Sequence, residues 1–281
     1  MKTSIGETQF EWGKKTYVMG VINMTPDSFS GDGLSNNVEE ALKQALTMQE
    51  QGADIIDVGG ESTRPAGKPY GEGAIKVSAK EELERVIPVI TSLKKELPIP
   101  ISIDTYKSEV AKEAIQAGAS LINDVWGLKK DKEIALVAAQ TNTPLIITHN
   151  QEGYEYSNLL EDITKQLQEA IEIAKDSGVP SENIIVDPGI GFGKTPEHNL
   201  EILRRLKEFK SELQSPVLIG TSRKSFIGHV LGDLPTQDRL EGTAATIAIA
   251  IANGADIVRV HDVKEMARVS RMTDAIVRQD N

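Results

Sequence analysis

The chain has 281 residues, 39% of them hydrophobic and 26% charged, which makes it long enough to bury a large core. Its net charge of −11 excludes non-specific binding to nucleic acids or anionic membranes, because their phosphates repel an acidic surface. Cysteine is absent, and this excludes disulfides, thiol catalysis and cysteine-ligated zinc sites.

No apolar run approaches the roughly 18 residues that indicate a membrane-spanning helix. The opening residues, Met1 to Gln9, lack the apolar segment of a signal peptide. We therefore expect a cytoplasmic protein with no membrane partner and no nucleic-acid partner.

Short runs rich in Val and Ile alternate along the chain with longer amphipathic stretches. The short runs predict eight buried parallel strands, at Val18–Asn23, Asp54–Gly59, Pro100–Thr105, Ser120–Val125, Pro144–His149, Asn183–Asp187, Pro216–Thr221 and Asp256–His261. The amphipathic stretches predict helices at about Val38–Gln51, Ala79–Glu96, Lys107–Ala117, Lys132–Gln140, Asn158–Ser177, Glu197–Leu213, Arg239–Asn253 and Val263–Arg278. The last helix carries an apolar stripe that we expect in the core rather than at an interface: Met266, Val269, Met272 and Ile276.

Eight strand–helix units over about 250 residues predict a (β/α)8 TIM barrel. We expect a single domain over residues 1–281, with the barrel proper at about 18–278. Residues Phe10–Tyr17 predict a short N-terminal β-hairpin, with its turn at Gly13, that covers the bottom of the barrel. A doubly wound open sheet has the same alternation and is the alternative fold.

Three segments repeat one junction between a helix and a strand. Gly52, Gly118 and Gly254 each stand where a helix should end in a left-handed residue, just before an apolar run. The residue five positions after each glycine is polar: Asp57, Asn123 and Arg259. A polar group near a strand end needs a partner or a ligand, because burying it alone costs free energy.

Polar residues end or nearly end seven of the eight predicted strands: Asn23, Asp57, Asp104, Asn123, His149, Asp187 and the pair Arg259 and His261. A single such residue is about as often a helix N-cap as a ligand-binding group. Their recurrence indicates a binding site, because the carboxyl ends of barrel strands meet at one mouth.

The connections after these strands support the same interpretation. Asn23–Gly33 and Gly59–Ser78 are long and rich in Gly and polar residues, which is typical of binding loops. Thr221–Gly228 combines hydroxyls, Arg223, Lys224 and a helix start, which predicts an anion site.

One motif resembles a phosphate-binding loop without matching it. Pro188–Thr195 nearly spells Gly-x-x-x-x-Gly-Lys-Ser/Thr, but Pro188 replaces the first glycine and the segment follows the sixth strand. We interpret it as a Gly-rich turn that lets Asp187 face the site, and we assign no role to Lys194 and no catalytic role to His149.

Two blocks of the sequence, Val21–Ser30 and Asp57–Pro65, resemble the signature blocks of the dihydropteroate synthase family. Further blocks resemble that family in its order: Ser102–Thr105, Ile122–Asp124, Asp187–Lys194, Ser222–Gly228 and Arg259–Val263. The resemblance covers about Val18 to Val263 and implies a TIM barrel. It also implies an enzyme that joins 6-hydroxymethyl-7,8-dihydropterin diphosphate to para-aminobenzoate by an SN1-like substitution, giving 7,8-dihydropteroate and diphosphate in folate biosynthesis.

The resemblance also implies roles for individual residues. The pterin diphosphate is expected to bind at Thr63, Asp104, Asn123, Asp187, Lys224, Arg259, Val260 and His261, with Asp57 in a supporting role. Para-aminobenzoate is expected at Phe29, Arg64, Pro65 and Ser225, the first three in loops that close over it. The implied catalytic residues are Asn23, Lys224, Arg259 and His261, and Asn23 is also expected beside a Mg²⁺ ion that the diphosphate chelates.

The residue chemistry agrees with these roles. Carboxylates and an amide can pair with the donor-rich edge of a pterin, and a lysine can reach its oxygen or ring nitrogen. Mg²⁺, Arg259 and His261 would neutralise the charge that grows on a departing diphosphate. By resemblance we expect a homodimer.

Two rival functions remain at this point. A barrel that passes a methyl group from a methylated folate to a corrinoid would share the pterin acids, but would not need the Ser222–Ser225 block or the Arg259 and His261 pair. A non-catalytic pterin-binding protein could lose Asn23 or Arg259, and this chain has both.

Overall fold

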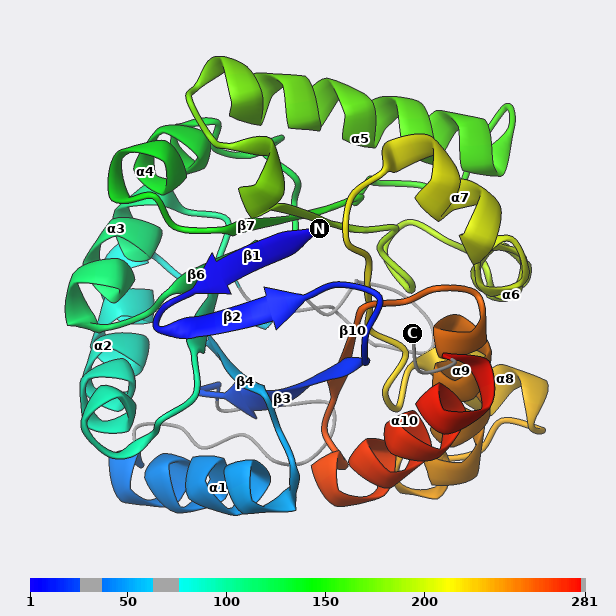
Figure 1. Cartoon of the computed structure of the whole chain (residues 1–281), viewed down its shortest axis with the longest axis horizontal. Coiled ribbons are helices and arrows are strands. Elements are labelled where there is room, and N and C mark those ends of the chain that lie inside the picture. The colour runs from blue at the N-terminus through cyan, green and yellow to red at the C-terminus, as the bar shows by residue number, and fades with distance from the viewer. Residues whose placement is uncertain (26–36, 63–75, 279–281) are drawn as a thin grey trace.

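The structure, a computed structural model, describes residues 1–25, 37–62 and 76–278. Eight parallel strands form a barrel inside a ring of helices (Figure 1). The strands are β3 (Tyr17–Asn23), β4 (Ile55–Gly59), β5 (Ile101–Asp104), β6 (Leu121–Asp124), β7 (Leu145–Thr148), β8 (Ile184–Asp187), β9 (Leu218–Ile219) and β10 (Ile257–Val260). Their order is β8-β7-β6-β5-β4-β3-β10-β9, and a parallel bridge between Val186 and Val217 joins the two outer strands. The predicted TIM barrel is therefore confirmed, and the open-sheet alternative is wrong.

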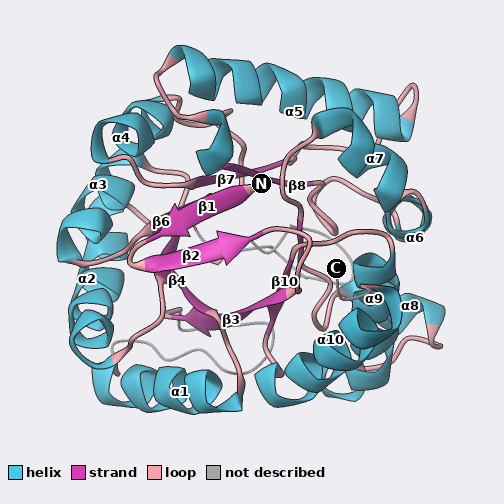
Figure 2. Cartoon of the chain, viewed as in Figure 1, coloured by secondary structure: helices cyan, strands magenta, loops and turns pink. Residues whose placement is uncertain are grey.

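Helices surround the strands in Figure 2. The longer ones are α1 (Val38–Gln51), α2 (Ala79–Glu96), α3 (Ser108–Ala117), α4 (Glu133–Thr141), α5 (Leu159–Asp176), α6 (Pro196–Arg204), α7 (Leu206–Leu213), α9 (Leu240–Ala252) and α10 (Val263–Val277). Short turns of helix are α8 (Ser225–Val230), η1 (Ser181–Asn183) and η2 (Thr236–Asp238). Within the described residues, no helix is both long and apolar enough to cross a membrane.

One predicted helix is two. The stretch expected as Glu197–Leu213 breaks at Arg205, whose φ of −105° and ψ of 17° leave the helical region. The side-chain amide of Asn253 donates to the carbonyl of Leu203 over 2.7 Å, so a distant residue takes an acceptor at the point where α6 ends. This competition comes from α9's carboxyl end and is not visible in the local pattern.

The N-terminal hairpin lies elsewhere in the chain than the sequence predicted. It pairs β1 (Lys2–Ile5) with β2 (Thr8–Glu11), and its turn is at Gly6, with a φ of +58°. Gly13 instead leads the chain into β3. The side chains of Ile5 and Phe10 join the cluster inside the barrel that includes Met19, so the hairpin covers the amino ends of the strands, as expected. Figure 1 shows it crossing in front of the barrel.

A second correction concerns the last helix. Met266 is buried against the barrel, but the side chains of Met272 and Ile276 are 64% and 68% exposed. The predicted apolar stripe is therefore only partly core, because the buried face of α10 runs through Met266, Ser270 and Thr273 and leaves Met272 and Ile276 on the outer face. Ile249 of α9 is also exposed.

The repeated glycine junctions are confirmed. Gly52, Gly118 and Gly254 have φ values of +106°, +122° and +101°, and each follows a helix and precedes a strand. A side chain would be strained in this left-handed conformation, so glycine lets the chain turn sharply into the next strand. Asp57, Asn123 and Arg259 are accordingly each the third residue of the strand that follows, β4, β6 and β10.

Candidate active site

The three polar residues of the repeated junction meet inside the barrel. Arg259 of β10 donates from Nε to Asp57 Oδ2 over 2.6 Å, and the Asn123 amide donates to the same oxygen over 3.1 Å. A second guanidinium nitrogen of Arg259 donates to Asp104 Oδ2 over 2.7 Å. Four strands that are far apart in sequence therefore supply one hydrogen-bonded cluster.

Strand register explains why these side chains face one another. Asp104 lies opposite Asn123 on β6 and opposite Gly59 on β4. Residues opposite each other in neighbouring parallel strands point to the same face of the sheet. Gly59 has no side chain of its own, so the Asp104 carboxylate occupies space beside it.

Asp187 and Lys224 continue this cluster along β8 and the turn after β9. Asp187 Oδ1 accepts from the N–H of Gly189 over 2.7 Å, and Lys224 Nζ donates to the carbonyl of Ile190. The Lys224 ammonium also lies 4.7 Å from the centre of the Phe192 ring.

Burial strongly perturbs the charged groups of the site. It raises the pKa of Asp104 to about 7, with Arg259 opposing this rise and Asp57 adding to it. It raises the pKa of Asp187, with Lys224 opposing the rise, and lowers the pKa of Lys224 to about 8. Buried, perturbed and mutually paired groups of this kind are typical of functional sites.

His261 and Asn23 lie at the same carboxyl end of the barrel. The His261 ring Nδ1 is 2.9 Å from Ser222 Oγ, which also accepts from the His261 backbone N–H over 3.1 Å. Asn23 ends β3, is half-buried, and has no side-chain hydrogen-bond partner among the described residues. Ser225 is the first residue of α8.

Val260 is placed differently from the other expected site residues. Its side chain is fully buried in the core cluster between strands and helices, beside Val258 and Val263. Any contact of Val260 with a ligand must therefore come from its backbone. Four further expected residues lie outside the described part of the chain: Phe29, Thr63, Arg64 and Pro65.

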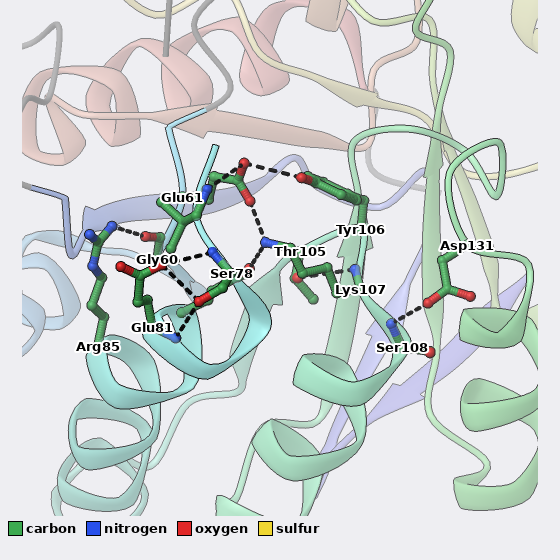
Figure 3. A network of polar contacts seen from close by, with 12 residues as sticks. Gly60, Glu61, Ser78, Glu81, Arg85, Thr105, Tyr106, Lys107, Ser108 and Asp131 are labelled. Atoms are coloured by element: carbon green, nitrogen blue, oxygen red, sulfur yellow. Dashed lines mark hydrogen bonds and ion pairs between the residues drawn. The ribbon is translucent and has the colours of Figure 1, made fainter. Parts of the chain in front are cut away.

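A second polar cluster borders the site where β4 leads toward α2 (Figure 3). Lys107 bridges the carboxylates of Glu61 and Glu82, both of which are buried. The Glu61 carboxylate also accepts from the Tyr106 hydroxyl over 3.1 Å and from the Val77 N–H over 3.4 Å. Glu61, just after β4, is therefore bonded both to Val77, just before α2, and to Tyr106 and Lys107, which follow β5.

Sequence reasoning missed several residues of the site. The Ser222 hydroxyl contacts the His261 ring and orients it. The Arg223 guanidinium donates two hydrogen bonds to the Asp262 carboxylate, over 2.9 and 2.5 Å, instead of forming an anion site with Lys224. Lys194 is buried against His149, with 2.8 Å between Nζ and the ring Nδ1. The sequence signal for Lys194 is its position directly after three alternating glycines. That pattern suggested only a phosphate-binding loop, which Pro188 in place of the first glycine excluded.

Comparisons with known proteins agree with the geometry. A family described as pterin binding enzymes matches residues 19–261. The dihydropteroate synthase of Clostridium beijerinckii is 55% identical over 276 residues, covering 98% of this chain and 99% of that protein. The crystal structure of a dihydropteroate synthase from Clostridium difficile in the presence of pteroic acid is 52% identical with a TM-score of 0.89, covering 96% of this chain and 100% of that one. That of Xanthomonas albilineans with 4-aminobenzoic acid is 37% identical with a TM-score of 0.87, covering 95% of each chain.

Proposed function

The chain belongs to the pterin-binding enzyme family, as a dihydropteroate synthase of folate biosynthesis, and we propose how its described residues perform this transferase reaction. The reaction joins 6-hydroxymethyl-7,8-dihydropterin diphosphate to para-aminobenzoate and releases diphosphate. The observation that carries the assignment of roles is the cluster at the carboxyl ends of the strands, in which the buried Asp104, Asn123 and Asp187 surround the half-buried Lys224 and Arg259.

The pterin is bound by the acids and amide of this cluster. Asp104, Asn123 and Asp187 accept from the donor-rich edge of the ring, and Lys224 donates to its oxygen or ring nitrogen. Asp57 supports them indirectly, because its carboxylate holds Arg259 and Asn123 in place. The carboxylates on two sides of Arg259 keep its pKa raised despite burial, so its guanidinium stays charged.

The diphosphate is bound by Arg259 and His261, together with Thr63 and the backbone near Val260. As the bond to diphosphate breaks, negative charge grows on the leaving group, and fixed cations stabilise that charge without reorganising. The amine of para-aminobenzoate then forms a C–N bond to the carbon that has lost diphosphate and releases one proton to the solvent, by an SN1-like route that needs no nucleophilic side chain. Phe29, Arg64, Pro65 and Ser225 bind the aminobenzoate in this proposal.

Mg²⁺ fits the residues present as a partner of the diphosphate. No group of three or more His, Asp or Glu side chains in the described ranges could hold a metal by itself. Mg²⁺ commonly takes one or two protein oxygens and completes its shell with substrate phosphates and water. The Asn23 amide oxygen would be that protein ligand, and the ion would add positive charge at the leaving group.

An enzyme assay tests the proposal. Purified protein is incubated with the pterin diphosphate, para-aminobenzoate and Mg²⁺, and dihydropteroate is measured together with released diphosphate. We expect both products in equal amounts, and much less diphosphate when para-aminobenzoate is omitted. A folded protein that forms no dihydropteroate would refute the proposal.

We also propose a homodimer and a location in the cytoplasm. The exposed apolar side chains of Ile249, Met272 and Ile276 support a dimer, because they lie on two helices that contact each other, and apolar surface that is not covered within a chain is typical of an interface. Light scattering should give twice the chain mass, and Met272→Glu with Ile276→Glu should halve it. The cytoplasmic location rests on the sequence expectation alone.

A further inference from the structure

Lys194 is a buried lysine that the reaction proposed above does not use. Its side chain follows β8, is 5% exposed, and donates to the carbonyl of Phe192 over 2.9 Å. Its Nζ also lies 2.8 Å from His149 Nδ1, at the end of β7. Burial lowers the pKa of Lys194 well below its ordinary value. Burying an amine costs free energy, which these two hydrogen-bond contacts only partly offset. The burial of Lys194 therefore calls for a functional reason.

His149 is suited to accept a hydrogen bond from this lysine. Burial, followed by the nearby charge of Lys194, lowers the pKa of the His149 imidazole to about 2, which keeps the ring neutral. A neutral imidazole has one acceptor nitrogen. His149 can therefore act as an acceptor for Lys194 over the whole physiological pH range.

The turn at residues 188–193 rests directly on the segment after β7. A Cβ added to Gly189 would lie 1.8 Å from the His149 carbonyl oxygen, and one added to Gly193 would lie 2.5 Å from that of Gln151. Both glycines have left-handed φ values, of +72° and +56°. Lys194 lies at this contact and bonds to both sides of it.

The same turn contacts two residues proposed to bind the pterin. The Gly189 N–H donates to Asp187, and the Ile190 carbonyl accepts from Lys224. Lys194 donates to the backbone carbonyl of Phe192, and the ring of the same residue has its centre 4.7 Å from Lys224 Nζ. A displacement of the turn would therefore move an acid and a cation of the pterin site together.

We propose that Lys194 is a positioning residue, which ties the turn after β8 to His149 and thereby places Asp187 and Lys224 for pterin binding. This inference rests on the proposed function, because it takes those two residues to be pterin ligands. Lys194 itself contacts no substrate in this scheme. The Tyr156 hydroxyl, which donates to the Gly193 carbonyl over 2.9 Å, ties the far end of the turn in the same way.

The test is Lys194→Met, with Lys175→Met as the matched control. Met keeps the unbranched shape but cannot donate to Phe192 or His149, whereas Lys175 is an exposed lysine on α5 paired with Glu172. We expect the KM for the pterin diphosphate to rise about tenfold, as for one lost hydrogen bond of about 1.4 kcal/mol. The KM for para-aminobenzoate should stay near the wild-type value, and Lys175→Met should leave both values unchanged.

A pH profile separates positioning from simple loss of stability. Lys224 faces Asp187 of β8, Asp104 of β5 and Arg259 of β10, and its titration should set an alkaline limb in kcat/KM. A looser turn admits water to Lys224 and relieves its burial, so the limb should move to higher pH in Lys194→Met. Lys194→Gln, which keeps one donor for the Phe192 carbonyl, should restore part of the pterin KM.

A second variant covers the case in which Lys194→Met does not fold. In Lys194→Met with His149→Leu both members of the buried pair become apolar, which removes the unpaired polar group and favours folding. The tie is still absent, so the pterin KM should again rise. Active wild-type enzyme beside folded variants with unchanged pterin KM and pH profile would overturn the inference, whereas inactive wild-type enzyme would overturn the proposed function instead.

Discussion

Arg259 is the residue around which the site is arranged. Its guanidinium hydrogen-bonds two buried carboxylates of the cluster, those of Asp57 and Asp104. Asp57 Oδ1 keeps no hydrogen-bond partner among the described residues, so this acid depends on Arg259 and Asn123 for its stability. Removing Arg259 would leave the buried Asp57 carboxylate without its cation, which is more costly than the intact pair.

Asp104→Asn and Asp187→Asn should weaken pterin binding without unfolding the barrel. Each lost charged hydrogen bond should reduce the binding free energy of a pterin ligand by roughly 1.5–3 kcal/mol. The pKa of Asp104 is about 7 in the fold against an ordinary 3.8, so its stabilising contribution is present below pH 3.8 and is lost as the pH rises to 7. At pH 8 the Asn variant should therefore melt no lower than wild type.

Calorimetry with pteroic acid and thermal melts at pH 8 check this pair of outcomes. Unchanged pteroic acid affinity would contradict the role in binding. A large fall in the melting temperature would make the two acids structural instead.

The charge of Lys224 should limit activity at high pH. Its pKa is about 8 in the fold against an ordinary 10.5, so raising the pH past 8 removes the positive charge, and kcat/KM should fall along a limb centred near that value. Between the two values the unfolded chain binds more protons than the folded one, so this group's contribution to stability rises with pH. Activity and stability should thus change in opposite directions, and Lys224→Met should abolish the stability trend.

At the scale of elements, ion pairs hold the described ends of the connection that leads from β4 to α2. Lys107, just before α3, forms ion pairs with Glu61 after β4 and with Glu82 of α2. Figure 3 shows Lys107 and Glu61 within this cluster. Burial raises the pKa of Glu82, with the contact to Lys107 opposing the rise. Gly60 is needed there, because an added Cβ would lie 2.7 Å from the Val86 side chain.

Lys107→Met should therefore destabilise the fold strongly. It leaves two buried carboxylates without a cation, and breaking a buried pair costs roughly 3–5 kcal/mol of unfolding free energy. Lys15→Met is the control, because Lys15 and Asp54 form an exposed pair whose loss costs about 1 kcal/mol or less. Urea unfolding measures both, and equal midpoints for the two variants would show that the Lys107 cluster is not structural.

At the scale of the whole molecule, the two substrates draw on different parts of the chain. The proposed pterin residues sit on the barrel strands and the turns beside them, whereas the proposed aminobenzoate residues come from three separate connections. Gathering three connections around a ligand costs conformational entropy, and the charges of Mg-diphosphate can offset that cost. Pterin diphosphate should therefore bind first.

Titration of labelled para-aminobenzoate checks the order. Its affinity should be low for the free enzyme and much higher once diphosphate and Mg²⁺ are present, and by linkage it should then slow the escape of diphosphate. Equal affinity in the two titrations would mean that the second site exists before the first is filled.

Local pattern and residue chemistry were enough to determine most of this molecule from the sequence. The apolar runs of buried parallel strands and the period of amphipathic helices are both visible within a dozen residues, so the barrel and the bounds of α1 and α2 follow from the sequence alone. The strand-end residues Asp57, Asp104, Asn123, Asp187 and Arg259 also follow, because in a barrel such positions converge at one mouth.

Only the tertiary structure decided which of these groups contact one another. Arg259 and Asp57 are 202 residues apart, and Lys194 and His149 are 45 apart, so no local pattern encodes either pair. The break at Arg205 likewise depends on Asn253, from another helix. The physical reason is the same in each case: hydrogen-bond partners of buried polar groups are chosen by distance after the barrel closes, and the sequence specifies only that some partner must be found.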